Sequence, residues 1–352
     1  MERIRIAILL VFLSVSVLVL GMVPEATAKE SPITKVALVL NGTLGDKSFF
    51  DSAARGVELA EADLPIKAKV IEAGYDPSKW EPALEDAAAS DYNIVIVGTW
   101  QMVDYVQDIA PRYPSKKFIV FDAVVDYSSG NLSNVYCMTY KQNEGSYLAG
   151  LYAALVSTSG LPMSNDAKVI GVIGGQDIPV INDFIVGYRQ GALAVDPKMK
   201  VLVQYVGNWS DAAKAKEIAL AMITQGADVI FNVAAGAGVG IFEAVRERKC
   251  YAIGVDSDQA MLFKETAPEM TAHILTSMVK NIDKSIYRAL QLYCKGKLAF
   301  GQAEALGILE GAVGLAKNQY YDQYTPGGIK AKVLKAEKDI LSGNVVVDTV
   351  FK

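Results

Sequence analysis

The chain has 352 residues, a formal net charge of −5 at neutral pH, and a composition that is 51% hydrophobic and 21% charged. This mildly acidic balance argues against a nucleic-acid partner, because phosphate binding needs a basic surface. One histidine and three widely spaced cysteines argue against a zinc site, thiol chemistry or a disulfide framework. We expect Cys137, Cys250 and Cys294 to be buried free thiols, with a single bridge as the alternative.

The first 28 residues have the pattern of a signal peptide. Arg3 and Arg5 form a basic start, residues 6–20 are apolar except for two serines, and Ala26-Thr27-Ala28 provides a small-residue cleavage site. The apolar run is shorter than the ~20 residues that a membrane-spanning helix needs, so we expect cleavage after Ala28. Because no cysteine lies near this site, we expect a periplasmic protein without a lipid anchor.

The remaining residues, 29–352, are too many for one typical hydrophobic core, so two domains are expected. In the first half, short apolar runs alternate with segments of helical spacing. The expected strands are 36–40, 67–71, 94–97, 118–121 and 135–138, and the expected helices are 49–62, 80–89 and 102–110. Apolar strands that are each followed by a helix indicate a buried parallel sheet.

The same alternation begins again after a helix expected at 144–155. The expected strands are 168–173, 201–205, 228–231, 251–255 and 273–275, and the expected helices are 180–193, 211–224, 239–247 and 278–292. A short helix at 333–339 and a strand at 345–347 are expected near the end of the chain. The predicted fold class is therefore α/β, with two doubly wound parallel-sheet lobes around a ligand cleft.

The chain is expected to pass between the lobes more than once. Lobe 1 is predicted to contain 33–140 plus about 260–295, and lobe 2 to contain 141–256 plus about 300–352, with hinges near 140 and 256–260. Right-handed crossovers place the carboxyl ends of all parallel strands at one edge of each sheet. The segments expected to converge in the cleft are 41–46, 98–100, 122, 174–177, 208–209, 234–238 and 256–259.

Several motifs of catalysis are incomplete in this chain. Gly236-Ala237-Gly238-Val239-Gly240 is not a dinucleotide-binding loop, since Ile241 stands where the third glycine would be. Its glycines more simply allow the backbone to approach a ligand or a neighbouring helix. There is no G-x-S-x-G elbow, and His273 is expected on a strand face rather than in a catalytic triad. Asp256 and Asp258 alone are too few for a metal site.

A recognition site fits Asp256 better than a catalytic one. Its carboxylate, at the end of strand 251–255, is placed to accept hydrogen bonds from ligand hydroxyl groups, whereas Asp258 is expected to be structural. Phe49 and Trp209 follow strands of opposite lobes and could sandwich a flat ring, although ordinary loop packing fits their spacing equally well.

Two further polar positions carry open alternatives. Lys280, expected on helix 278–292, could reach a ligand hydroxyl or pair with Asp256, and a solvated helix charge fits equally well. Asp46 and Ser48 have the residue types of a helix cap, which is compatible with a ligand role.

A more specific pattern runs from about residue 33 to the C-terminus. Its main segments are Asn41-Gly42-Thr43-Leu44-Gly45-Asp46-Lys47-Ser48-Phe49, Val206-Gly207-Asn208-Trp209-Ser210-Asp211, Ala235-Gly236, Gly254-Val255-Asp256-Ser257-Asp258-Gln259 and Thr276-Ser277-Met278-Val279-Lys280. In this order they resemble the basic membrane protein family. Its members are substrate-binding proteins of ABC transporters and include purine nucleoside receptors.

The resemblance implies a type I periplasmic-binding-protein fold that closes on a nucleoside, with no enzymatic activity and no cofactor. By position, Phe49 and Trp209 match aromatics that stack on the base, and Asp122 matches an aspartate that bonds it. Asp256 and Lys280 match the residues that hold the ribose. The predicted ligand-binding residues are Asn41, Asp46, Phe49, Asp122, Trp209, Gly236, Asp256 and Lys280. An inner-membrane ABC permease is the implied partner, and we expect a monomer.

Departures from the family pattern leave the ligand open. The family commonly has aspartate at the position of Asn41 and asparagine at that of Phe50, so a modified nucleoside, a free nucleobase or another flat polar ligand remains an alternative. Most relatives are lipoproteins, whereas this chain has no cysteine near the expected cleavage site to which a lipid could be attached. A nucleoside hydrolase is the alternative of a different class, and it would need a cluster of aspartates around a metal. A repressor is disfavoured because a signal peptide stands where its DNA-binding headpiece would be, while a sensor role stays open.

Overall fold

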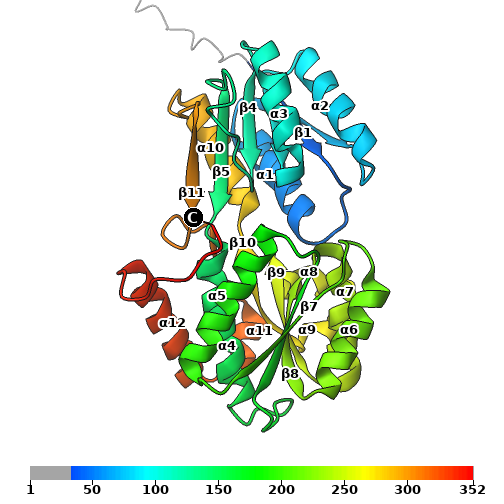
Figure 1. Ribbon diagram of the computed structural model, residues 1–352, viewed down its shortest axis with the longest axis vertical. Coiled ribbons are helices and arrows are strands. Elements are labelled where there is room, and N and C mark those ends of the chain that lie inside the picture. The colour runs from blue at the N-terminus through cyan, green and yellow to red at the C-terminus, as the bar shows by residue number, and fades with distance from the viewer. Residues whose placement is uncertain (1–32, 352) are drawn as a thin grey trace, which may run out of the picture. The chain divides into compact units, whose positions relative to one another are not determined.

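The computed structural model describes residues 33–351, so the expected signal peptide lies outside the described part of the chain. Within this part, the strands form two six-stranded sheets, and helices cover both faces of each sheet (Figure 1). We call each sheet with its covering helices a lobe, and number the lobes in chain order.

The sheet of the first lobe is parallel throughout, in the order β11-β5-β4-β3-β1-β2. Its strands are β1 (Thr34–Leu40), β2 (Ile66–Glu72), β3 (Ile94–Gly98), β4 (Lys117–Phe121), β5 (Val135–Tyr140) and β11 (Gln302–Leu306). Its helices are α1 (Phe49–Asp63), α2 (Trp80–Ala89), α3 (Val103–Ile109) and α10 (Ile282–Cys294), with 3₁₀ turns η1 (Pro77–Lys79), η2 (Trp100–Met102) and η3 (Ala110–Arg112).

The sheet of the second lobe has the order β12-β10-β9-β8-β6-β7, and only the edge strand β12 runs antiparallel. Its strands are β6 (Val169–Gly174), β7 (Lys200–Tyr205), β8 (Ala227–Val233), β9 (Tyr251–Asp256), β10 (Ile274–Lys280) and β12 (Val313–Leu315). Its helices are α4 (Gln142–Ser157), α5 (Pro179–Val195), α6 (Ala212–Thr224), α7 (Gly238–Arg248), α8 (Gln259–Phe263), α9 (Pro268–Thr271), α11 (Gln319–Tyr324) and α12 (Gly327–Leu341), with the 3₁₀ turn η4 (Ala235–Ala237).

The strands are buried on both faces because each sheet lies between two helical layers. In β1, Val36, Leu38 and Leu40 belong to the core cluster that contains α1 and α10 side chains. Ala37 and Val39, which point the other way, belong to the cluster with α2 and α3. This two-sided burial explains the near-continuous apolar runs in the sequence and confirms the predicted α/β class.

The chain changes lobe at three places, and the predicted boundaries differ from them. One crossing follows β5 near Tyr140, as expected. The second follows β10, because β10 pairs with β9 in the second sheet while α10 packs on α1. The third lies between β11, which pairs with β5, and β12, which pairs with β10. Residues 260–280 therefore belong to the second sheet and residues 302–306 to the first, the reverse of the prediction.

The C-terminal tail also differs from the prediction. The helix expected at 333–339 is longer, as α12, and residues 345–347 form no strand. Side chains hold the tail instead: Asn143 Nδ2 donates to the carbonyls of Val347 and Asp348 at 3.2 and 3.1 Å. In the same region, Asp183 Oδ1 accepts from Thr349 Oγ1 at 2.6 Å.

Two predictions concerned groups away from the strand ends. All three cysteines are free; Cys137 and Cys250 are buried as expected, whereas Cys294 is exposed. His273 lies just before β10, with Nδ1 2.8 Å from the carbonyl of Cys250.

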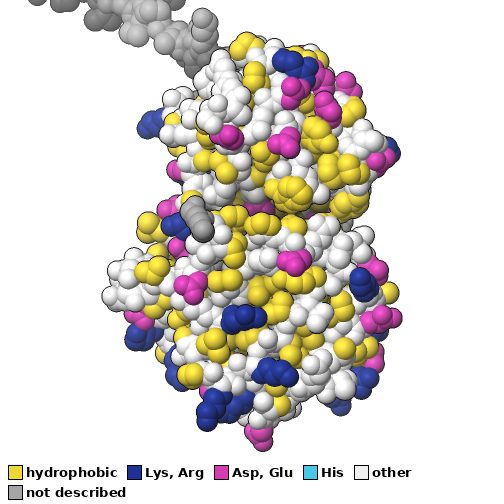
Figure 2. Space-filling model, viewed as in Figure 1, with side chains coloured by type: hydrophobic (Ala, Val, Ile, Leu, Met, Phe, Trp, Pro, Cys, Tyr) yellow, Lys and Arg dark blue, Asp and Glu magenta, His cyan; other side chains and the backbone are white. Residues whose placement is uncertain are grey.

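None of the described helices is long and apolar enough to cross a membrane. On the face seen in Figure 2, basic and acidic side chains are interspersed.

Candidate functional site

The eight predicted residues all lie at the carboxyl ends of strands. In the first lobe, Asn41 follows β1, Asp46 and Phe49 lie in or just after the β1–α1 loop, and Asp122 follows β4. The remaining four belong to the second lobe: Trp209 follows β7, Gly236 follows β8, Asp256 ends β9 and Lys280 ends β10. The ion pair between Asp122 and Lys280 connects the two sets directly, and a hydrogen bond from Ser48 links Asp256 to the first lobe.

The β1–α1 loop is shaped by Asp46. Its carboxylate accepts from the backbone N–H groups of Ser48 and Phe50, each at 2.9 Å, and of Asp51 at 3.2 Å. These bonds satisfy free N–H groups at the start of α1. Burial raises the pKa of Asp46, and the three backbone bonds oppose that rise. Both oxygens are thus engaged by the backbone, so Asp46 positions Phe49, the first residue of α1.

Lys280 joins the two lobes through an ion pair. It is 1% exposed at the end of β10, and its ammonium pairs with the carboxylate of Asp122. Three aromatic rings surround the ammonium: the centroids of Phe49, Tyr140 and Phe184 lie 5.7, 5.1 and 5.3 Å from Nζ. Cation–π contacts of this kind attract an ammonium group to the ring faces. Burial raises the pKa of Asp122, and Lys280 opposes that effect.

Lys280 was predicted on a helix at 278–292, and this prediction is wrong. Met278 and Lys280 belong to β10, whose residues are nearly all buried between neighbouring strands. Asp256 was the predicted partner if Lys280 formed an ion pair. The structure joins Lys280 to Asp122 instead, because β10 ends beside the point where the chain leaves β4 of the other lobe.

Asp256 contacts the first lobe through a serine. Ser48 Oγ donates to Asp256 Oδ2 at 2.5 Å, and Ser257 Oγ donates to the Ser48 carbonyl at 3.3 Å. Burial raises the pKa of Asp256 to about 6, with Lys280 and the Ser48 hydroxyl opposing the rise. Asp256 is 8% exposed, so it is a desolvated carboxylate with one oxygen engaged by Ser48.

Backbone strain is concentrated at these strand ends. Thr99 and Asp122 directly follow β3 and β4, Ala235 lies two residues after β8, and Asp256 ends β9; their φ values are 74°, 60°, 48° and 60°. Residues other than glycine rarely adopt positive φ, and each such position costs of the order of 1–3 kcal/mol. Strain of this kind is typical of binding sites, where the surrounding structure holds a side chain in one direction.

The indole ring of Trp209 lies close to Gly175, the glycine that follows the neighbouring strand β6. A Cβ atom at Gly175, just after β6, would be 2.2 Å from the indole ring, so only glycine permits this approach. The Trp209 carbonyl accepts from Ala237 N at 2.8 Å. Gly236 lies between that carbonyl and Asp46 of the first lobe, at 3.3 and 3.9 Å from a Cβ position. Phe49 packs on Phe121, with ring centroids 5.5 Å apart.

Asn41 is buried at the end of β1. Its Nδ2 donates to Thr99 Oγ1 at 2.9 Å and to Gln101 Oε1 at 3.4 Å. Its Oδ1 has no hydrogen-bond partner within residues 33–351. Asp258, by contrast, accepts from Asn318 Nδ2 at 2.7 Å, at the cap of α11, in line with the structural role expected for it.

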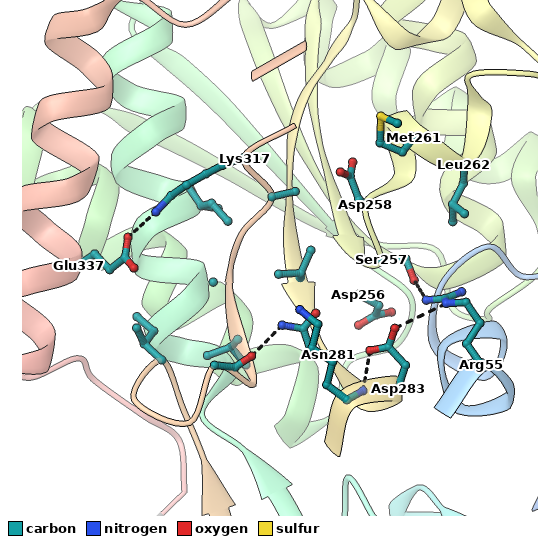
Figure 3. Close-up of a pocket in the computed structure, with 18 residues that line it drawn as sticks. Arg55, Asp256, Ser257, Asp258, Met261, Leu262, Asn281, Asp283, Lys317 and Glu337 are labelled. Atoms are coloured by element: carbon teal, nitrogen blue, oxygen red, sulfur yellow. Dashed lines mark hydrogen bonds and ion pairs between the residues drawn. The ribbon is translucent and has the colours of Figure 1, made fainter. Parts of the chain in front are cut away.

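A pocket of about 550 Å³ adjoins Asp256 but none of the other seven predicted residues. It is lined by α1, the β9–α8 loop, β10, the start of α10, the β11–β12 connection, β12 and α12. Figure 3 shows Arg55 and Lys317 of this pocket directed at partners, whereas Asp256 and Asp258 have no partner among the residues drawn. Arg55 Nη2 donates to Ser257 Oγ at 2.8 Å and Arg55 Nε lies 3.6 Å from Asp283, while Lys317 pairs with Glu337.

Sequence reasoning missed several residues of this region. Ser48 was expected as a helix cap, with a ligand role also compatible, yet its side chain makes no cap bond and binds Asp256. Tyr140 and Phe184 gave no signal, because ordinary core positions have the same pattern. No described group of three or more His, Cys, Asp or Glu side chains is placed to hold a metal ion, which the hydrolase alternative would require.

Comparisons with known proteins identify relatives over nearly the whole described chain. Residues 33–345 match the family model for PnrA-like ABC transporter substrate-binding proteins. Basic membrane protein A of Borreliella afzelii is 29% identical over 322 residues, covering 90% of this chain and 92% of that protein. The ABC transporter nucleoside-binding protein BmpA of Lactococcus lactis subsp. cremoris is 29% identical over 330 residues, covering 89% and 88%.

A solved structure agrees in fold. A solute-binding protein of an ABC transporter system from Aeropyrum pernix K1 superposes with a TM-score of 0.79 at 22% identity, covering 91% of this chain and 94% of that one. This likeness confirms the predicted two-lobe fold of periplasmic solute-binding proteins.

Proposed function

This chain belongs to the Bmp family of PnrA-like ABC transporter substrate-binding proteins, and we propose that it binds a purine nucleoside and delivers it to the permease of an importer. It acts as a periplasmic monomer, after cleavage of the chain behind Ala28 has removed the signal peptide. The relative from Lactococcus lactis that is named as nucleoside-binding supports this choice of ligand.

The observation that carries the proposal is the group of buried charges that connects the two lobes. Asp122 and Lys280 form an ion pair, and the positive charge of Lys280 also opposes the rise in the pKa of Asp256 that burial causes. Two carboxylates beside one ammonium, all largely desolvated, suit a ligand that brings several hydroxyl and N–H groups. A nucleoside brings both: vicinal ribose hydroxyls and the polar edge of a base.

The roles follow from the chemistry of each group. Asp256 is fitted to accept from the ribose hydroxyls, because a carboxylate accepts two hydrogen bonds in parallel. Lys280 donates to the ribose oxygens, and Asp122 accepts from the base. Phe49 and Trp209 contribute ring faces for stacking on the base. Gly236, which lacks a side chain beside Asp46 and Trp209, lets the second lobe approach closely.

Closure of the lobes on the nucleoside is the expected mechanism of capture. Ser48–Asp256, Ser257–Ser48 and Gln259 Nε2–Lys47 carbonyl are hydrogen bonds between the lobes, the last at 3.3 Å. A ligand held by both lobes adds its own contacts to these bonds and shifts the population toward the closed state.

Thermal unfolding with a ligand panel tests the proposal. Inosine, guanosine or adenosine at about one hundred times its Kd stabilises the native state by about 2.7 kcal/mol and raises Tm. Adenine and hypoxanthine serve as controls for the ribose: equal shifts with base and nucleoside would favour a nucleobase receptor. Mass spectrometry of the ligand retained on purification identifies the base. If no nucleoside or nucleobase at millimolar concentration shifts Tm, the proposal is wrong.

A further inference from the structure

Asn41 carries a buried acceptor that the protein itself does not use. The side chain is 4% exposed, and both hydrogens of its amide are directed at neighbouring oxygens, Thr99 Oγ1 and Gln101 Oε1. The oxygen of the same amide has no partner in the described part of the chain. Buried polar atoms are usually hydrogen-bonded, and an unpaired one needs an explanation.

The structure holds this amide in one orientation. Thr99 directly follows β3, the neighbour of β1 in the sheet, and is held at φ 74°, a strained value for a β-branched residue. Backbone bonds fix it on both sides: its N–H donates to the Phe121 carbonyl at 3.2 Å, and its carbonyl accepts from Met102 N at 3.2 Å. Thr99 Oγ1 therefore stays beside Asn41 Nδ2. With its hydrogens engaged, Asn41 offers only an acceptor.

The position of this acceptor connects it to the proposed ligand site. Asn41, Thr99 and Asp122 stand at the ends of β1, β3 and β4, which are consecutive strands of the first sheet. Asp122, the residue assigned to the base, is thus two strands away from Asn41 along the same edge. Asn41 and Asp122 are both largely buried, so a flat ring at this edge would meet two acceptors and no free amide donor from Asn41.

We propose that Asn41 is a specificity-determining residue that requires an N–H group on the edge of the bound base. The inference rests on the proposed function. It names the ligand class more closely: nucleosides whose base carries a ring N–H, as in inosine and guanosine, or an exocyclic amino group, as in adenosine. A base that lacks such a donor leaves Asn41 Oδ1 desolvated and unpaired, and is rejected for that reason.

Binding of matched nucleosides to the full chain tests this inference. Purine riboside has the ribose and the flat ring of inosine but no N–H on its six-membered ring, so isothermal titration of both compounds isolates the donor. Wild-type protein is expected to bind inosine or adenosine at least about tenfold more tightly than purine riboside. Asn41→Leu is expected to lower that preference to within about threefold of unity. Asn41→Asp keeps an acceptor and is expected to retain the preference.

The outcomes separate this inference from the proposed function. If wild-type protein binds no nucleoside, the proposed function fails and the inference falls with it. If nucleosides bind but Asn41→Leu keeps the wild-type preference, the inference alone is overturned. Thr99→Val, which preserves the β-branched shape while removing the oxygen that holds the amide, decides the matter if Asn41→Leu does not fold. The preference of the Thr99→Val variant for inosine over purine riboside should fall at least about threefold. An unchanged preference overturns the inference. Asn131→Leu, in an exposed loop, is the control for added apolar surface.

Discussion

Lys280 at the end of β10 forms an ion pair with Asp122 at the end of β4, and so connects the sheets of the two lobes. The charge of Lys280 also opposes the rise in the pKa of Asp256 that burial causes, and the charge of Asp183 adds to the rise in the pKa of Asp122. Lys280 thus offsets two carboxylates, Asp122 and Asp256. Removal of Lys280 and removal of the carboxylate of Asp256 should have opposite effects on stability.

Replacing Lys280 by methionine should destabilise the protein strongly. Methionine keeps the length and the contacts with Phe49, Tyr140 and Phe184 but leaves Asp122 buried without its cation. Breaking a buried ion pair in this way costs about 3–5 kcal/mol. Urea denaturation of Lys280→Met measures the loss, and Lys284→Met, at an exposed position of α10, is the control.

A second substitution distinguishes lost charge from lost packing. In the double variant Lys280→Met, Asp122→Asn the unpaired carboxylate is gone, so much of the lost stability should return. If the double variant is as unstable as the sum of both single variants, the ion pair does not explain the effect. Nucleoside binding should be lost in either case, because both residues are assigned to the ligand.

Asp256→Asn should raise stability at neutral pH while weakening nucleoside binding. Burial raises the folded-state pKa of Asp256 from 3.8 to about 6. The stability that this group contributes is therefore fully present below pH 3.8 and is lost as the pH rises through 6. Asparagine can still accept from Ser48 Oγ but carries no charge. The difference in free energy of unfolding between the variant and the wild type should therefore grow by about 1–3 kcal/mol, in favour of the variant, as the pH rises from 4 to 7.5.

Ligand affinity should depend on pH in the opposite direction. The ionised carboxylate of Asp256 accepts from both ribose hydroxyls, whereas the protonated form gives up one acceptor. Nucleoside affinity of the wild-type protein should therefore rise as the pH increases from 5 to 7, and that of Asp256→Asn should be low and nearly flat. Titration calorimetry at several pH values measures both. A wild-type affinity that is constant across this range would exclude Asp256 from the ribose contact.

The strand-end logic of α/β folds placed most of the candidate site residues at the strand ends where the structure has them. Asp122 and Asp256 each follow a short apolar run, and such runs in two doubly wound units predict a shared cleft. The apolar run of β10 was read only in part, because Thr276 and Ser277 interrupt it and the following residues also fit helical spacing. The edge strand β11 was missed because Gln302 and Glu304 alternate with alanines in it, so no continuous apolar run marks this largely exposed strand.

Contacts between distant segments could not be predicted from these patterns. The bond from Ser48 to Asp256 joins residues that are 208 positions apart, and neither residue type indicates the other. The same holds for Thr99 and Asn41, which meet only because β1 and β3 are neighbours in the sheet. Pattern and propensity place such residues at an edge, whereas the pairing of side chains there depends on strand order and on strained backbone angles.

Gly175→Ala should weaken nucleoside binding through Trp209. A Cβ atom at this position would lie 2.2 Å from the indole ring, so the ring must move away from the β6 strand end. Stacking of a base on an aromatic side chain is worth about 1–3 kcal/mol, so a displaced ring should cost about tenfold in affinity. Trp209→Ala should show a loss of similar size, and the two changes should not add when combined.

A matched glycine controls for the added methyl group. Gly130→Ala has open space around its Cβ position and should leave affinity unchanged. Additive losses in the double variant would mean that Gly175 and Trp209 act independently, and that Gly175 does not act through the position of the indole ring.

Arg55→Gln should speed the release of ligand with little effect on stability. Arg55 on α1 of the first lobe donates to Ser257 Oγ, just after β9 of the second lobe, and Asp283 on α10 holds the guanidinium from the side. The bond between the lobes exists only when they are closed. Its loss should raise the dissociation rate about two- to tenfold, since a partly exposed hydrogen bond to a charged group is worth at most about 1.5 kcal/mol here. Stopped-flow displacement of the nucleoside measures this rate.

Arg112→Gln, which breaks an ion pair with Glu85 inside the first lobe, is the matched control. Equal rates for the two variants would show that Arg55 does not hold the closed state.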